Sequence, residues 1–298
     1  MTVVRLFGVR IILSRSFLAL LAVLAACGLL VEALILFGVA FMHELAHVVC
    51  ARLCGLGVAE VELLPFGGVA RVETQIELNP GLEAKVALVG PLANAVAVGA
   101  PLLLNGLGLW PSELDRRFVE ANLLIGGFNL IPALPLDGGR VYRAWLVARM
   151  GFRRATVRAA RLGRFCGLVL VVLGSLLLYL GHASVSVVAV GFFLFVAAKK
   201  EQEEAVYVLM RYLARRRGTL VQNPNALVRH VVVGEDTPLK EVLDHLVPQR
   251  YLLVWVLDRR GHLAGFAGEL EVIDALFQEG IETPAGRIAT PLRSHSGL

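Results

Sequence analysis

Charged side chains are scarce in this sequence. Asp, Glu, Lys and Arg supply 18% of its 298 residues, whereas soluble domains average about 25%. Hydrophobic residues make up 57%, and the mean hydropathy is +0.70. A soluble enzyme of this length needs a polar surface that this composition does not supply. The scarcity of charge therefore excludes an ordinary soluble domain and predicts a polytopic α-helical membrane protein.

Cysteines and internal repeats are also few. The four cysteines lie in or beside apolar runs, where single thiols behave as small hydrophobic side chains. This placement excludes a framework of disulfides. The sequence shows no internal repeat of the kind that many transporters carry.

Long apolar runs are abundant. A bilayer core about 30 Å thick needs roughly 20 apolar residues in each helix. The basic segment that precedes the first run is expected to lead into a retained span, because no cleavage site is followed by a soluble chain. About six spans are predicted, at 11–31, 33–54, 84–106, 118–136, 164–181 and 184–198.

The positions of Lys and Arg predict the orientation of these spans. Basic residues gather in the N-terminal segment and in the connections after the second, fourth and sixth spans, whereas the other connections carry only Arg116 and Arg117. Such an excess is typical of the cytoplasmic side. We therefore expect a multi-pass cell-membrane protein with cytoplasmic N- and C-termini. The net charge of +5 then reflects this orientation, and no direct nucleic-acid partner is expected.

The polar tail predicts a separate cytoplasmic unit. The expected organisation is a transmembrane domain at 1–200, a basic linker at 201–222 and a small α/β domain at 223–298. Thr237 and Pro238 predict the start of a helix. Two strands and a second helix should follow, at Tyr251–Leu257, Leu263–Ala267 and Glu269–Glu279.

The second span contains the pattern H-E-x-x-H, formed by His43, Glu44 and His47. Residues four apart share a helix face, so both imidazoles can bind one zinc ion while Glu44 acts as a general base. Ionisable groups inside a span usually mark function. Two alternatives stay open: a polar cluster that only packs, and a thiolate site that includes Cys50 or Cys54. The thiolate site leaves Glu44 without a role.

A catalytic zinc site needs a third protein ligand, and Asp137 is the best candidate. Spans two and four both run towards the cytoplasm, which brings Asp137 and the histidines to similar depth. Pro132 and Pro135 should break the helix, and the two glycines after Asp137 should release the chain. Irregular backbone at this depth is tolerated beside a watered cavity. The alternative is a simple helix exit with Asp137 paired to Arg140.

Three further features predict how a peptide substrate is held. The alternating pattern of 58–73 predicts a hairpin with Phe66 at its tip. The hairpin edge, or the extended segment from Pro132 to Pro135, can add a strand to the substrate, with Phe66 touching it. Asn129 can donate to the developing oxyanion, or it can satisfy backbone groups freed by Pro132.

Three motifs together carry a family resemblance. H-E-L-A-H at 43–47, G-P-L-A-N at 90–94 and N-L-I-P-A-L-P-L-D-G-G at 129–139 resemble the site-2 protease family (peptidase family M50) of intramembrane zinc metalloproteases. The resemblance covers roughly residues 1–200. It implies that His43, His47 and Asp137 hold one Zn²⁺ and that Glu44 activates the water. For Asn94, we expect helix packing only.

The tail resembles a cystathionine-β-synthase (CBS) domain. Within the family, the chain is most similar to a sporulation protease with one CBS domain, which activates a membrane-associated sigma-factor precursor at the mother-cell membrane around the forespore. The resemblance implies such a substrate, inhibitory membrane partner proteins, a homo-oligomer formed through the CBS-like domain, and ATP as a candidate ligand. The usual nucleotide signature is altered here, because Gly268 replaces its hydroxyl residue and Glu271 its Asp or Asn.

A function from another class also fits an intramembrane His/Asp cluster. An ion-conducting or metal transporter, gated by the CBS-like domain, would use the same ionisable groups to carry ions. Internal repeats would favour it, and their absence makes hydrolysis the preferred prediction.

Overall fold

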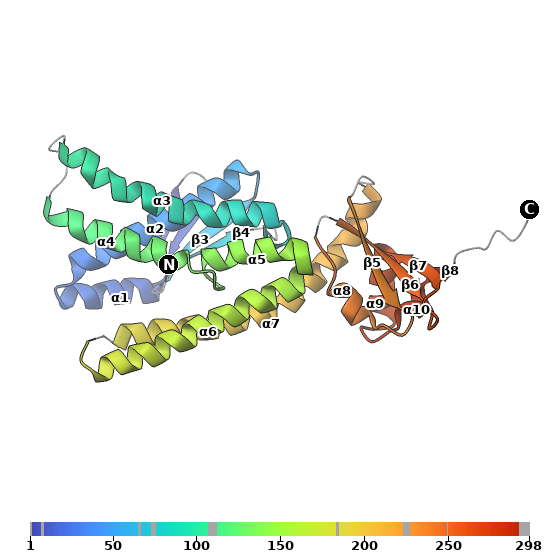
Figure 1. Cartoon of the computed structure of the whole chain (residues 1–298). Helices are drawn as coiled ribbons and strands as arrows, with labels where there is room; N and C mark the ends of the chain where they lie inside the picture. The colour runs from blue at the N-terminus through green and yellow to red at the C-terminus, as the bar shows by residue number, and fades with distance from the viewer. Residues whose placement is uncertain are drawn as a thin grey trace, which may run out of the picture. The chain divides into compact units, whose positions relative to one another are not determined.

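The structure is a computed structural model that describes residues 2–6, 9–64, 67–72, 76–106, 112–182, 185–222, 227–248 and 250–291. It is mostly helical (Figure 1). The described residues include two four-stranded sheets. The chain forms two compact units. The first contains 1–142 and 161–198, and the second contains 143–160 and 199–298. The domain limits expected at 200 and 222 stay predictions.

The first unit begins with strands that the sequence did not suggest. Strands β1 (Thr2–Leu6), β2 (Val9–Leu13), β3 (Val58–Leu64) and β4 (Gly67–Val72) form one sheet in this order. The β2–β3 pair is parallel and the other two pairs are antiparallel. The β3–β4 pair confirms the predicted hairpin.

The first helix starts later than expected. Ser14 caps α1 (Arg15–Ala26), because its side-chain oxygen accepts a hydrogen bond from the Phe17 amide at 3.1 Å. The expected span at 11–31 was therefore wrong at its start. Its first residues belong to β2, where β-branched side chains favour a strand.

The first unit also contains several longer helices, some of them only in part. They are α2 (Leu30–Leu53), α3 (Pro80–Gly106), α4 (Ser112–Asn129), α6 (Phe152–Tyr179) and the start of α7 (Val185–Gln222), with a short 3₁₀ helix at Ile76–Leu78. Helix α2 packs on α3 and α4, which also contact each other (Figure 1). Among the described residues, three helices are long and apolar enough to span a bilayer: Leu30–Leu53, Pro80–Pro101 and Phe152–Tyr179. The predicted total of six spans remains a prediction.

The connection from α4 to α5 (Asp137–Met150) is irregular, as the two prolines predicted. The glycines do not release the chain, however, since Gly138 and Gly139 lie in the first turn of α5. A Cβ at Gly138 would overlap the carbonyls of Leu130 and Ile131, and one at Gly139 would overlap the backbone of Ala133. These glycines let the connection pack directly on α5, which holds Asp137 in place.

The tail of the second unit confirms the predicted order of helix, strand, strand and helix. Its sheet order is β5-β6-β7-β8, in which β5 and β6 are parallel and the other pairs antiparallel. The expected basic linker at 201–222 is helical, because α7 continues to Gln222. The elements are β5 (Leu227–Gly234), α8 (Leu239–Leu243), β6 (Arg250–Leu257), β7 (Leu263–Gly268), α9 (Glu269–Gln278), α10 (Ala285–Ile288) and β8 (Thr290–Pro291).

The elbow between α5 and α6, residues 148–154, packs against this tail. Arg153 and Arg154 both pair with Asp244, at 2.6 and 3.2 Å. The Phe152 amide donates to the Leu246 carbonyl at 3.3 Å. Gly151 has a positive φ of 81°, a conformation that glycine adopts without strain. The C-terminal end of α5 is therefore held by the tail.

Candidate metal centre

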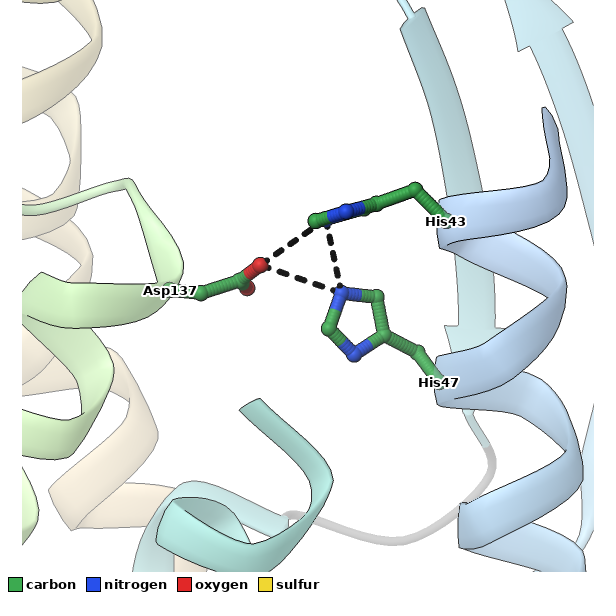
Figure 2. A group of neighbouring side chains, drawn as sticks. All are labelled: His43, His47 and Asp137. Atoms are coloured by element: carbon green, nitrogen blue, oxygen red, sulfur yellow. Dashed lines mark hydrogen bonds and ion pairs between the residues drawn. The ribbon is translucent and has the colours of Figure 1, made fainter. Parts of the chain in front are cut away.

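Three side chains from two distant segments converge in the first unit. His43 and His47 lie one turn apart on α2, and Asp137 is the first residue of α5. The Oδ2 atom of Asp137 lies 3.0 Å from Nε2 of His43 and 3.1 Å from Nε2 of His47. The two Nε2 atoms are 3.1 Å apart. All three residues are buried, with exposed fractions of 3%, 8% and 6%. Figure 2 shows the side chains pointing towards one another.

Hydrogen bonding alone does not account for this triangle. If both Nε2 atoms carry protons, two donors face each other at 3.1 Å. If either Nε2 is unprotonated, its lone pair faces the carboxylate oxygen of Asp137. A cation at the centre satisfies all three atoms. Ligands at 2.0–2.1 Å from a tetrahedral zinc lie roughly 3.3 Å apart, which is close to the observed spacing.

The outer nitrogens of both imidazoles have partners that favour this arrangement. Nδ1 of His47 lies 2.7 Å from the carbonyl oxygen of Val86. A carbonyl only accepts, so Nδ1 donates and the Nε2 lone pair points to the centre. Nδ1 of His43 donates to Oδ1 of Asn94. Such outer partners orient histidines that bind metals.

Asn94 makes a contact with the cluster that was not expected from the sequence. Packing alone was expected there, whereas its buried amide contacts His43 across 51 residues of chain. The signal was its spacing in G-P-L-A-N, which places Asn94 one helical turn after Gly90 on α3.

Gly90 is the closest neighbour of the triangle on α3. A Cβ at this position would overlap Nε2 of His47 and approach Cε1 of His43. The absence of a side chain therefore leaves open the space beside the converging Nε2 atoms, where a ligand or a water molecule needs room.

Glu44 lies beside the triangle without joining it. It is half-buried and interacts electrostatically with both imidazoles, with Asp137 and with Arg140. Within the described residues, His43, His47 and Asp137 form the one cluster with metal-ligand spacing. Cys50 and Cys54 do not join it, and Arg140 is exposed.

The residues predicted to hold a substrate differ in where they lie. The Asn129 amide donates to the Ile125 carbonyl of its own helix at 3.0 Å, so it has a local partner. Pro132 is exposed and Pro135 half-buried in the irregular connection. Phe66 lies outside the described residues.

Comparisons with known proteins identify relatives of this chain. The family model described as peptidase family M50 matches residues 31–110. A zinc metalloprotease of Methanocaldococcus jannaschii is 29% identical over 275 residues, which cover 89% of this chain and 76% of that protein. Stage IV sporulation protein FB of Bacillus subtilis (strain 168) is 28% identical over 262 residues, covering 86% of this chain and 89% of that protein.

A solved structure supports the same assignment. The site-2 protease from Methanocaldococcus jannaschii matches with a TM-score of 0.52 and 29% identity, covering 67% of this chain and 95% of that one. The transporter alternative is not favoured by these matches. The chain belongs to the site-2 protease family, and it is an intramembrane zinc metalloprotease.

Proposed function

We propose that this protease holds one zinc ion through His43, His47 and Asp137 and cleaves a membrane-associated protein near the cytoplasmic face. The convergence of three ligand atoms at 3.0–3.1 Å carries this proposal. Membership of the family indicates that the metal is zinc, and two imidazoles with one carboxylate are a donor set that zinc prefers.

Zinc and Glu44 have separate roles in the proposed hydrolysis. Bound zinc supplies a Lewis acid that polarises the scissile carbonyl and favours ionisation of the attacking water. Glu44 accepts the proton of that water and passes it to the leaving amine. Its place beside the imidazoles and its partial exposure suit a group that must exchange protons.

The substrate must be extended before its amides can react, since a helix protects them with internal hydrogen bonds. Among the described strands, β4 is the last in its sheet, and an edge strand is where an extended peptide can add by strand pairing. The irregular segment from Pro132 to Pro135 is a second candidate. Phe66 and Asn129 remain proposed contacts of the substrate.

The membrane arrangement proposed from the sequence has six spans and cytoplasmic termini. The three apolar helices found in the structure support membrane insertion. Cleavage near the cytoplasmic side follows from placing His43 and His47 in the inner half of α2, and Asp137 beyond the inner end of α4, at the start of α5.

For the natural substrate, we propose a sigma-factor precursor processed during sporulation at the mother-cell membrane, under the control of inhibitory membrane proteins. The likeness to the Bacillus subtilis sporulation protein supports this choice. A panel of membrane-tethered sigma-factor precursors, co-expressed with wild-type or Glu44→Gln protein, tests it. Cleavage of one precursor by the wild type alone supports it, and no cleavage across the panel contradicts it.

The tail is proposed to be a CBS-like regulatory domain that also forms a homo-oligomer. Its strand–helix–strand–strand–helix order supports this. Helix α5 begins with Asp137 and ends at the elbow that the tail contacts, which gives the tail a mechanical route to a metal ligand. ATP remains a candidate ligand. Gly268 stands where the nucleotide signature has a hydroxyl residue, and a side chain there would overlap the Tyr251 hydroxyl and approach Glu271.

A further inference from the structure

The two imidazoles of the metal centre differ in what determines their tautomer, that is, which ring nitrogen carries the proton. The partner of His47 is the Val86 carbonyl, which only accepts. The partner of His43 is the side-chain amide of Asn94. An amide can present either an acceptor or a donor, so this contact alone does not determine the tautomer of His43.

The orientation of the Asn94 amide is set by a second amide. Nδ2 of Asn94 donates to Oδ1 of Asn122 at 2.9 Å, and Nδ2 of Asn122 donates to the Phe118 carbonyl at 2.9 Å. Both asparagines are 1% exposed, so bulk water does not compete for these groups. These hydrogen bonds form a row that runs from His43 through Asn94 and Asn122 to the Phe118 carbonyl. Because this carbonyl only accepts, each amide in the row has one favourable orientation.

We propose that Asn122 is a positioning residue that fixes the metal-binding tautomer of His43 by orienting Asn94. In the observed orientation, Asn94 accepts from Nδ1 of His43 and leaves the Nε2 lone pair for the metal. In the reversed orientation, Asn94 donates to Nδ1, which places the proton on Nε2. That proton would face His47 and Asp137 and block coordination. The inference rests on the proposed role of His43 as a ligand.

Packing between α3 and α4 supports the same role. Gly126 lies one turn after Asn122, and a Cβ at this position would lie 2.9 Å from Cβ of Asn94. The glycine therefore lets the two helices approach closely at the level where their amides meet. Three helices, α2, α3 and α4, contribute to the row from His43 to Phe118.

The first test replaces Asn122 with alanine in the full-length protein. Asn94 then loses the acceptor that orients it. We expect zinc affinity, measured by competition with a chelator, to fall about 10- to 100-fold, as for other outer-shell changes. In the zinc-free protein, ¹⁵N NMR of His43 should show protonation moving from Nδ1 towards Nε2.

A second variant separates this role from simple loss of structure. Asn94→Asp presents two acceptor oxygens and no donor, so its orientation no longer matters. The double variant Asn94→Asp with Asn122→Ala should therefore bind zinc more tightly than Asn122→Ala alone. Thr156→Ala is the matched control, because it also removes a buried side-chain bond to a carbonyl four residues earlier, on α6 and outside the site. Its zinc affinity should equal that of the wild type.

Three results would contradict either the inference about Asn122 or the proposed function. Wild-type zinc affinity in folded Asn122→Ala overturns the inference, as does a double variant that binds no better than the single one. If Asn122→Ala does not fold, the comparison of Asn94→Asp with Asn94→Leu decides, since only the former retains an acceptor for Nδ1. Unchanged zinc binding in His43→Ala would instead contradict the proposed function.

Discussion

The Oδ2 atom of Asp137 lies 3.0 Å from Nε2 of His43, although 94 residues separate them in the chain. The contact depends on the packing of the 130–136 connection against the first turn of α5, where two glycines allow close approach. It converts a two-histidine pattern on one helix into a site with three converging ligand atoms.

Replacing Asp137 with alanine should remove one of these atoms. We expect zinc affinity to fall by more than the roughly 10- to 100-fold seen when outer-shell partners of a metal are lost. Metal analysis of the purified protein, with and without competing chelator, measures this. Full retention of zinc would remove Asp137 from the ligand set.

Glu44→Gln should separate metal binding from catalysis. The amide preserves the size of the side chain but cannot accept the proton of water, so the cleavage rate should fall about 10²- to 10⁴-fold. Zinc content should stay at the wild-type level. A variant that cleaves at the wild-type rate would show that Glu44 is not the base.

Gly90→Ala should damage the centre by steric contact. The added methyl group overlaps Nε2 of His47, so the imidazole must move and zinc affinity and cleavage should both fall. Gly99→Ala is the matched control on the same helix, because a Cβ there meets nothing within 4 Å. Equal behaviour of the two variants would contradict the close approach of α3 to the histidines.

The tail should lose stability in mild acid through His245. Burial, together with Arg154 and Arg229, lowers the pKa of His245 in the folded protein, while Asp244 and Glu241 oppose the shift. The unfolded chain therefore binds the proton more readily, and stability falls as the pH drops through the ordinary histidine range.

Hydrogen exchange of β6 amides in the full-length protein measures this effect. Protection should decrease from about pH 7.5 to about pH 5.5, after correction for intrinsic exchange rates, and the decrease should be smaller in His245→Gln. An identical pH dependence in both proteins would exclude His245 as the cause.

Much of the metal centre was predictable, because helical periodicity alone places His43 and His47 on one face. Asp137 required matching a second motif. The contact of Asn94 with His43 was not predictable, since it depends on how α3 packs on α2. The N-terminal strands were missed because an apolar run rich in β-branched residues fits a strand or a span, and only pairing with β3 selects the strand.

The ligand set itself can be tested by X-ray absorption at the zinc edge of the purified protein. We predict one zinc ion per chain with nitrogen and oxygen neighbours at about 2.0–2.1 Å and no sulfur. The nitrogen component should shrink in His47→Ala. A sulfur neighbour at about 2.3 Å, as Cys50 or Cys54 would supply, or a spectrum unchanged in His47→Ala, would contradict it.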